Sequence, residues 1–191
     1  MHSIANPHKA AGKLAPNAPY PSVDAGRVAD LLTQCPTFAE TPRTAVDLAP
    51  VAALWVKDER ARMNLGSFKA LGAAYVLALQ AVEIAPRPGS GTLNGHTYVT
   101  ASACNHGMSV AAGARIFGAN ARIFLAKDVP AGFERRLKDT QQAEVVRAGD
   151  TYEESVEAAK HNAADTGAIL LADGSWPGYV DPPALIMEGY T

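Results

Sequence analysis

The amino-acid sequence predicts an α/β fold of three layers, with a parallel β-sheet between two layers of helices. From residue 96 onward, short apolar segments typical of strands alternate strictly with longer segments typical of helices. This alternation is the pattern of βαβ units, in which each helix connects two parallel strands. The chain has 191 residues, of which 48% are hydrophobic and 19% charged, so it can bury the core of one domain or of two small ones.

The N-terminal region predicts fewer regular elements. The first 25 residues are rich in Pro, Ala and Asn without periodicity, and we expect a flexible lead-in there. Residues 25–35 fit a short helix, and Pro36 suits its end. Residues 51–59 predict a buried strand that ends in charged residues. Residues 67–84 are a run of good helix formers with Ser67 as a plausible N-cap.

The rest of the chain contains the alternating elements. A capping box of Thr151 and Glu154 opens one helix, and Gly118 and Gly167 close two of them. A further helix begins after Trp176, and the chain stops inside it, as expected of half a domain. The predicted strands are residues 96–102, 121–126, 143–148 and 168–173, and the predicted helices are residues 105–118, 130–142 and 151–167.

Composition excludes several classes of function. Seventeen basic and nineteen acidic residues give a net charge of −2, too balanced to predict binding to nucleic acid or to an anionic membrane. No apolar run approaches the roughly 20 residues that span a bilayer. Two cysteines, Cys35 and Cys104, fit free thiols in a reducing cytoplasm. No histidine has another His or a Cys at zinc-ligand spacing, so we expect no metal site.

Polar residues gather in three segments that follow apolar ones. These are the charged loop of residues 57–72, the turn of residues 100–111, and residues 171–179 with Asp173. Binding sites in parallel sheets lie at the carboxyl ends of strands. We therefore expect the three segments to converge at one edge of the sheet.

Lys69 is unusual because its neighbours along the chain are small or apolar. The positive end of the helix dipole and an apolar environment both disfavour an ammonium, and a neutral lysine amine can form a Schiff base. Taken alone, the segment favours a lysine whose stem packs while its ammonium reaches water.

The segment after the first strand of the alternation has the features of an anion site. Ser102, Asn105 and His106 precede or open a helix whose first N–H groups are free to bind a carboxylate, and Gly107 would let a ligand approach the backbone. The alternative is a polar turn with Ser102 or Asn105 as the N-cap. The glycines of residues 88–95 form neither a dinucleotide fingerprint nor a Walker loop, which disfavours a nucleotide-binding domain.

Two stretches together resemble a known superfamily. Residues 56–77, with Ser-Phe-Lys, and residues 101–126, with Ser-x-x-Asn-His-Gly, resemble the fold type II pyridoxal-phosphate enzymes, which share the fold of the tryptophan synthase β-subunit. This superfamily includes threonine synthase, the threonine and serine dehydratases and the diaminopropionate ammonia-lyases. Residues 172–191 are most similar to the ammonia-lyases. The resemblance covers residues 35–191 and corresponds to an N-terminal half.

The resemblance implies roles for individual residues. Lys69 would hold pyridoxal 5'-phosphate as a Schiff base and later take the Cα proton of the substrate. Asn105 would hydrogen-bond the phenolic oxygen of the cofactor, and Ser102, Asn105 and His106 would bind the substrate carboxylate. The ammonia-lyases carry an acidic residue at the position of Ala103, so Asp173 is a candidate for the missing acid/base.

The implied reaction is α,β-elimination from a small amino acid such as diaminopropionate, giving a keto acid and ammonia. A dehydratase or a β-replacement enzyme of the same superfamily is the enzymatic alternative, and a non-catalytic fragment that acts by interaction is the other. Another departure is Cys104, where the superfamily usually has Gly. We expect the complete protein to be a homodimer, with a C-terminal half supplied by the rest of the gene product.

The resemblance also divides the chain. We expect residues 1–90 to form the N-terminus and the first part of a large domain, residues 91–178 a small βαβ domain, and residues 179–191 the return to the large domain.

Overall fold

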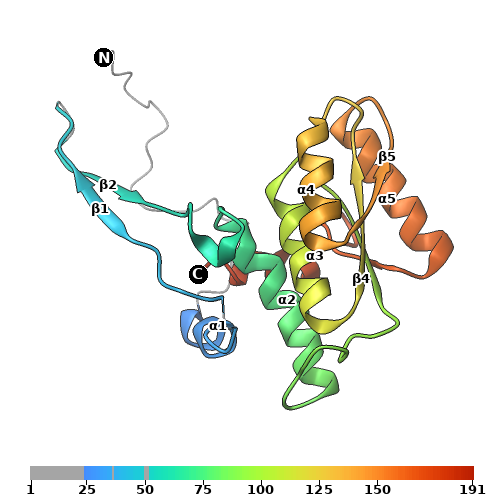
Figure 1. Cartoon of the computed structure of the whole chain (residues 1–191), viewed down its shortest axis with the longest axis horizontal. Helices are drawn as coiled ribbons and strands as arrows, with labels where there is room; N and C mark the ends of the chain where they lie inside the picture. The colour runs from blue at the N-terminus through green and yellow to red at the C-terminus, as the bar shows by residue number, and fades with distance from the viewer. Residues whose placement is uncertain (1–23, 36, 50–51) are drawn as a thin grey trace.

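The computed structural model describes residues 24–35, 37–49 and 52–191. The expected lead-in, except for its last two residues, and Pro36 lie outside the described residues. Figure 1 shows two unlike parts, a body of helices around a sheet and a slender two-stranded arm that extends away from it. None of the described helices is both long and apolar enough to cross a membrane.

The body contains the predicted parallel sheet. Its strands are ordered β5-β4-β3-β6 and all pair in parallel. The chain moves from β3 through β4 to the edge at β5, then crosses back over the sheet to place β6 on the other side of β3. The direction of winding therefore changes between β3 and β6. The strands are β3 Thr97–Ala101, β4 Asn120–Leu125, β5 Glu144–Arg147 and β6 Ile169–Leu170.

Helices cover both faces of this sheet, as the three-layer prediction requires (Figure 1). On one face, Tyr98, Ile123 and Leu125 join a core shared with α3 and α4. On the other face, Val99 and Phe124 pack against α5. Alternate residues of each strand thus point to opposite layers. The helices are α3 Asn105–Phe117, α4 Ala131–Gln141 and α5 Tyr152–Thr166.

The predicted helix ends of the body are confirmed. Thr151 accepts the N–H of Glu154 while the Glu154 side chain accepts the N–H of Thr151, which is a complete capping box. Gly118 and Gly167 end α3 and α5 with φ of 79° and 71°, in the left-handed region that favours glycine.

A further layer of helices packs on α3. It is formed by α2 (Lys69–Ile84) with α6 (Asp181–Glu188) beside it. A Cβ at Gly72 would lie 2.6 Å from the Tyr190 ring and 2.8 Å from Ile186, so glycine is needed for this close approach. The last helix ends at Glu188 and is capped at Gly189, so the expectation that the chain stops inside it was wrong.

The two other predicted helices near the N-terminus are shifted slightly. The first, α1 (Ala25–Leu32), ends before Cys35, and its Leu32 packs on Tyr75 of α2. The second begins at Lys69 with Phe68 at the N-cap position, rather than at Ser67. The Ser67 hydroxyl nevertheless accepts the N–H of Lys69 at 3.2 Å, and so still supports the first turn.

The prediction of a buried strand within residues 51–59 was wrong in its burial. A strand, β2 (Leu54–Lys57), is present, but only Leu54 is half-buried. It pairs antiparallel with β1 (Arg43–Val46), which was not predicted and is exposed throughout. In the described part of the chain no second layer covers this hairpin, and Trp55 is 58% exposed beneath the Arg43 guanidinium.

Candidate active site

A pocket of about 340 Å³ lies where the winding of the sheet changes direction, at the carboxyl ends of β3 and β6. This is the usual place for a ligand in an open α/β sheet. The structure brings all five predicted site residues to this pocket, from α2, from the start of α3 and from the segment after β6. Its lining consists of Lys69, Ala101, Ser102, Ala103, Cys104, Asn105, His106, Tyr152 and Asp173.

Lys69 and Asp173 form an ion pair across the pocket, although they are 104 residues apart in the sequence. Lys69 is the first residue of α2 and its side chain is 36% exposed, whereas that of Asp173 is 18% exposed. The expected surroundings of small and apolar side chains alone are therefore not found. Asp173 neutralises the ammonium and holds the amine at the wall of the pocket.

Asp173 is a carboxylate at neutral pH. Burial alone raises its pKa, but the hydrogen bond and positive charge of Lys69, with a contribution from the nearby His106 ring, more than offset that effect, so the pKa lies below its ordinary value. At neutral pH Asp173 is thus a hydrogen-bond acceptor that faces Lys69.

The segment that carries Asp173 is held by Tyr179. The Tyr179 hydroxyl accepts the N–H of Ala172 at 2.9 Å and donates to the carbonyl of Leu170 at 3.0 Å. These two hydrogen bonds hold the backbone at the end of β6 and just after it, where the pairing with β3 has ended. They fix the backbone immediately before Asp173.

Ser102 organises the turn into α3. Its Oγ accepts the N–H of Cys104 at 3.1 Å and the N–H of Gly107 at 2.9 Å, as in the alternative of a polar turn. A Cβ at Gly107 would lie 2.8 Å from the Ser102 Cβ and 2.9 Å from Ile123. The glycine therefore allows the close contact of helix, turn and strand, and it is not among the residues that line the pocket.

His106 is buried and ties α3 to the end of β6. Its Nε2 lies 2.8 Å from the carbonyl of Leu171 and, as the protonated nitrogen, donates to it. Desolvation lowers the pKa of His106 below its usual value, so the ring is neutral at pH 7. Among the described residues Nδ1 has no hydrogen-bond partner. A neutral, buried ring offers no cation to a substrate carboxylate.

Asn105 is the first residue of α3 and is exposed to the pocket with the free N–H groups of the helix start. Its Oδ1 accepts the thiol of Cys104 at 3.4 Å. The amide and the helix terminus are the polar groups best exposed for an anionic ligand.

Sequence reasoning missed Tyr152. It is the first residue of α5 and lines the pocket, and burial with the nearby charge of Asp173 raises its pKa. The signal was available, because α5 begins just after β5 ends at the same edge of the sheet.

The fold and the pocket define a class of enzyme. A lysine amine beside a carboxylate and a helix N-terminus, at the switch point of a parallel sheet, can bind a carbonyl compound and an anion together. The chain belongs to the pyridoxal-phosphate dependent enzymes, because the model of that family matches residues 36–191.

Its relatives include diaminopropionate ammonia-lyases. The protein of that name from Escherichia coli (strain K12) is 30% identical over an alignment of 169 residues, and the match covers 80% of this chain and 42% of the relative. The one from Salmonella typhimurium (strain LT2) is 28% identical over an alignment of 158 residues, and the match covers 73% of this chain and 38% of the relative. This chain therefore spans less than half the length of these curated relatives.

Solved structures of a diaminopropionate ammonia-lyase are also similar to this chain. The crystal structure of the holo diaminopropionate ammonia lyase from Escherichia coli has a TM-score of 0.78 at 28% identity and covers 86% of this chain and 46% of that one. The complex of that enzyme with an aminoacrylate-PLP azomethine reaction intermediate has a TM-score of 0.75 at 30% identity, over 86% of this chain and 44% of that one.

The pocket residues fit one end of pyridoxal phosphate. Lys69 offers an amine to its aldehyde, Asn105 offers an amide, and the volume lies within the range of small-molecule sites. For the phosphate, the described lining residues offer no cation other than Lys69. The part of the site seen here thus fits the aldehyde and substrate end of the cofactor.

Proposed function

We propose that this chain carries the Schiff-base lysine and the substrate-binding loop of a pyridoxal-phosphate dependent lyase. The complete protein would eliminate the β-substituent of a small amino acid such as diaminopropionate, giving a keto acid and ammonia. The observation that carries the proposal is the single pocket shared by Lys69, Asp173 and the start of α3.

The proposal also divides the chain between two domains. Residues 1–90, which include the N-terminus, would belong with residues 179–191 to a large domain, since α2 and α6 pack together. Residues 91–178 would form the small domain around the sheet. The pocket would then lie between the two, with Lys69 on the large side and Ser102, Asn105 and His106 on the small side.

Each residue has a task in this reaction. Bound pyridoxal phosphate would supply the aldehyde that captures amines and the ring that accepts the electron pair of Cα. Lys69 would hold the aldehyde, and its amine, once replaced by that of the substrate, would take the Cα proton. Asp173 would orient the Lys69 ammonium after the transfer, because the two already form an ion pair.

The carboxylate of the substrate would bind at the start of α3. Asn105 and the free N–H groups there are donors, and Ser102 can donate its hydroxyl proton, since its oxygen serves the turn only as an acceptor. His106 would act on position rather than charge, by fixing the distance between α3 and the segment of Asp173.

The first test is the site of covalent attachment. Incubation of the whole gene product with pyridoxal phosphate, reduction with borohydride and peptide mapping should place the pyridoxyl group on Lys69. The Lys69→Arg variant should lose the label. Lys127→Arg is the matched control and should retain it, because Lys127 is an exposed lysine outside the pocket, paired with Asp150. A label on Lys57 or Lys127 in the unmodified protein would contradict the proposal.

The second test concerns stereochemistry in the whole gene product. Lys69 serves only one face of the substrate, and Ala103, which lines the pocket, has no titratable group. We expect ammonia release from L-diaminopropionate alone, and the Ala103→Asp variant should gain activity on the D-isomer. Equal turnover of both isomers by the unmodified protein would be inconsistent with this expectation and would indicate Asp173 as a second base.

A further inference from the structure

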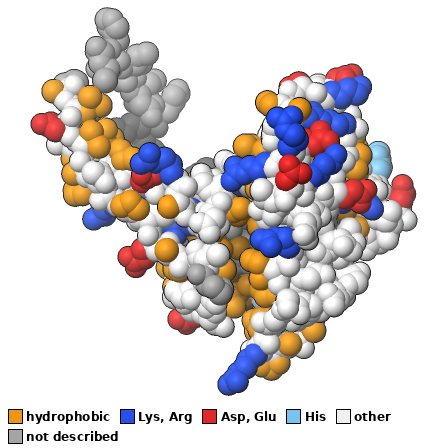
Figure 2. Space-filling model, in the orientation of Figure 1, with side chains coloured by type: hydrophobic (Ala, Val, Ile, Leu, Met, Phe, Trp, Pro, Cys, Tyr) orange, Lys and Arg blue, Asp and Glu red, His pale blue; other side chains and the backbone are white. Residues whose placement is uncertain are grey.

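A second cavity, of about 570 Å³, lies between α1 and the surface formed by α2 and α3. It shares no lining residue with the active-site pocket. Figure 2 shows hydrophobic side chains gathered in the hollow between α1 and the body. Its volume is within the range of small-molecule sites. The apolar lining residues are Leu31, Leu32, Met63, Ala74, Ala78, Pro88, Ile116 and Phe117.

Small residues create the space. Ala74 and Ala78 are one turn apart on α2 and both line the cavity, and Gly113 adds a third short side from α3. A Cβ at Gly113 would lie 2.8 Å from Leu77, so α2 and α3 are already in close contact there. The two helices therefore leave no room to close the cavity by moving together.

The charges at the cavity have one sign. Arg87 and Arg115 line it, and its described lining includes no Asp or Glu. Within the described residues neither arginine forms an ion pair, and the hydrogen bond from Arg115 Nε to Gln141 is long, at 3.4 Å. Two unpaired guanidinium groups beside an apolar cavity match a ligand with an apolar body and one carboxylate.

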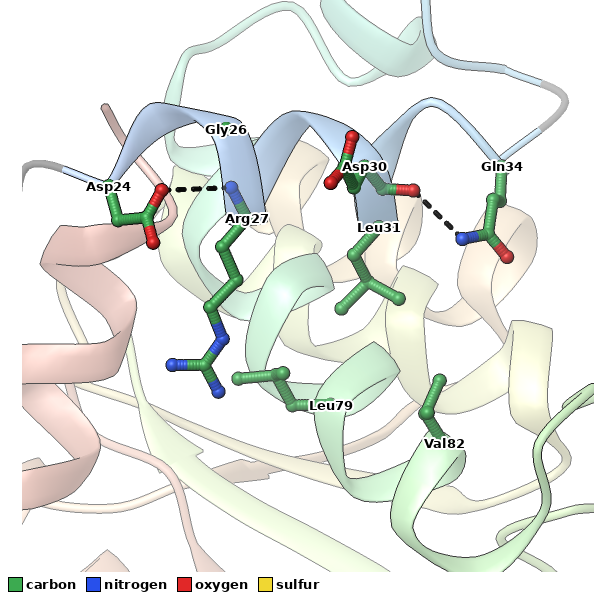
Figure 3. Close-up of a pocket in the computed structure, with 8 residues that line it drawn as sticks. All are labelled: Asp24, Gly26, Arg27, Asp30, Leu31, Gln34, Leu79 and Val82. Carbon is green, nitrogen blue, oxygen red and sulfur yellow. Dashed lines mark hydrogen bonds between the residues drawn. The ribbon is translucent and has the colours of Figure 1, made fainter.

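A neighbouring hollow beside α1, which shares Leu31 and Gln34 with this cavity, differs in the charges that line it. Figure 3 shows Asp24, Arg27 and Asp30 on one helix above Leu79 and Val82. There the positive charge has counter-charges, since Arg27 also lies 3.6 Å from Glu188. Two carboxylates and one guanidinium line that hollow, so it does not favour an anionic ligand, and the two hollows are not equivalent.

We propose that the cavity between α1, α2 and α3 binds a small apolar monocarboxylate, with its carboxylate at Arg87 and Arg115 and its body against Ala74 and Ala78. The N-terminal segment of the chain is a poor occupant by charge. Residues 1–23 contain two lysines and no acidic residue, so they would add positive charge beside the arginines.

Octanoate is a suitable probe, and calorimetry and NMR chemical shifts are suitable measurements. We expect one octanoate per chain with a dissociation constant of about 1 mM or lower. The Arg87→Gln/Arg115→Gln double variant should bind at least about tenfold more weakly, because hydrogen bonds to charged groups are lost. Arg135→Gln is the matched control, since Arg135 is exposed on α4 outside the cavity, and it should bind like the unmodified protein.

Ala74→Phe should block the cavity and remove binding, and its thermal unfolding shows whether it is folded. The proposal is overturned if octan-1-ol binds as well as octanoate, if the double variant binds unchanged, or if shifts map away from α1, α2 and α3. It is also overturned if octanoate binds only after residues 2–23 are deleted, since that segment would then be the natural occupant.

Discussion

The sheet of the body and the β1–β2 hairpin are both made of short apolar strands, but only the sheet is buried. Val99 and Ile123 are fully buried between helices on both faces, whereas Trp55 and Val56 are 58% and 43% exposed. The difference in burial comes from the helices that cover the sheet and not from the strands themselves. A strand is buried when the chain supplies covering elements next to it in sequence, as α3, α4 and α5 do for the body.

This comparison explains how the site is built. Four of the five predicted site residues sit at the end of a fully supported strand or at the start of the helix that follows it. Lys69 is the exception, because the chain reaches it from the hairpin through the turn at Arg62–Asn64. Its position depends on how that turn is held.

The largest difference in stability between the two regions should come from truncating strand residues. Ile123→Ala removes a fully buried side chain from β4 and should lower the free energy of unfolding by about 2–5 kcal/mol. Val56→Ala in β2 should change it by about 0.5 kcal/mol or less. Chemical denaturation of both variants measures this. Equal losses would show that the hairpin is buried in solution.

The next effect concerns the turn before Lys69. Arg62 is buried and donates to both carboxylate oxygens of Glu59, at 2.6 and 3.0 Å, to Thr41 Oγ1 at 2.7 Å and to the carbonyl of Ala39 at 2.9 Å. It thus fixes the base of the hairpin to the turn. Arg62→Met should cost about 2–4 kcal/mol, below the full value for a buried pair because Glu59 is 18% exposed.

Hydrogen exchange of the backbone amides in Arg62→Met measures which segments lose stability. Exchange should accelerate in β1, β2 and the first turn of α2, with little change in β3 and β4. Arg60→Met is the control, because Arg60 pairs with Asp58 on the surface and should alter neither exchange nor stability measurably. Uniform acceleration across the body would mean that the hairpin and the body unfold as one unit.

A smaller effect is expected at the start of α3. Gly107→Ala forces a Cβ to within 2.8 Å of Ser102 and 2.9 Å of Ile123, and should cost about 1–3 kcal/mol. Gly132→Ala in α4 meets only the end of Arg135, at 3.7 Å, and should be stabilising by about 0.5–1 kcal/mol. Opposite signs in thermal unfolding confirm that the site turn is tightly packed. A neutral Gly107→Ala would show that the turn can move.

The same contrast separates what the sequence predicts from what it does not. Every strand and helix of the body was predicted, because periodicity and caps such as Thr151–Glu154 are local signals. Residues 51–59 were predicted to be buried because an apolar run looks the same whether or not another layer covers it. The partner strand β1 has only four residues and no clear alternation.

The sequence predicted five of the residues that line the pocket, but not the residues with which they form hydrogen bonds. The rule that strand ends converge predicted one pocket for the three segments that contain Lys69, Ser102, Asn105, His106 and Asp173, and the resemblance to the fold type II enzymes gave these residues their roles. Their partners are long-range and were missed. The ion pair of Lys69 joins residues 104 positions apart, and the bond from His106 to Leu171 spans 65. No local pattern encodes such pairs.

The pH dependence of stability should also distinguish the site from the hairpin. The pKa of His106 is lowered by burial, so the unfolded chain takes up a proton before the folded one does. Stability from this group is complete above about pH 6.5 and is lost as the pH falls below it. His106→Asn should reduce the slope of unfolding free energy between pH 7 and pH 5. An unchanged slope would mean that the ring is protonated in the folded state.

The smallest effect compares two aspartates at lower pH. The pKa of Asp173 is lowered by charges that only the fold brings near, so its contribution is present above about pH 4 and is lost as the pH falls further. The pKa of Asp58 is lowered to about 2 by Arg60, two residues away, and that pair can also form in the unfolded chain. Asp173→Asn should therefore flatten the loss of stability below pH 4, whereas Asp58→Asn should leave it unchanged. Urea denaturation between pH 5 and pH 3 measures both slopes. If the Asp58 variant alone flattens the curve, the hairpin and not the site governs the acid transition.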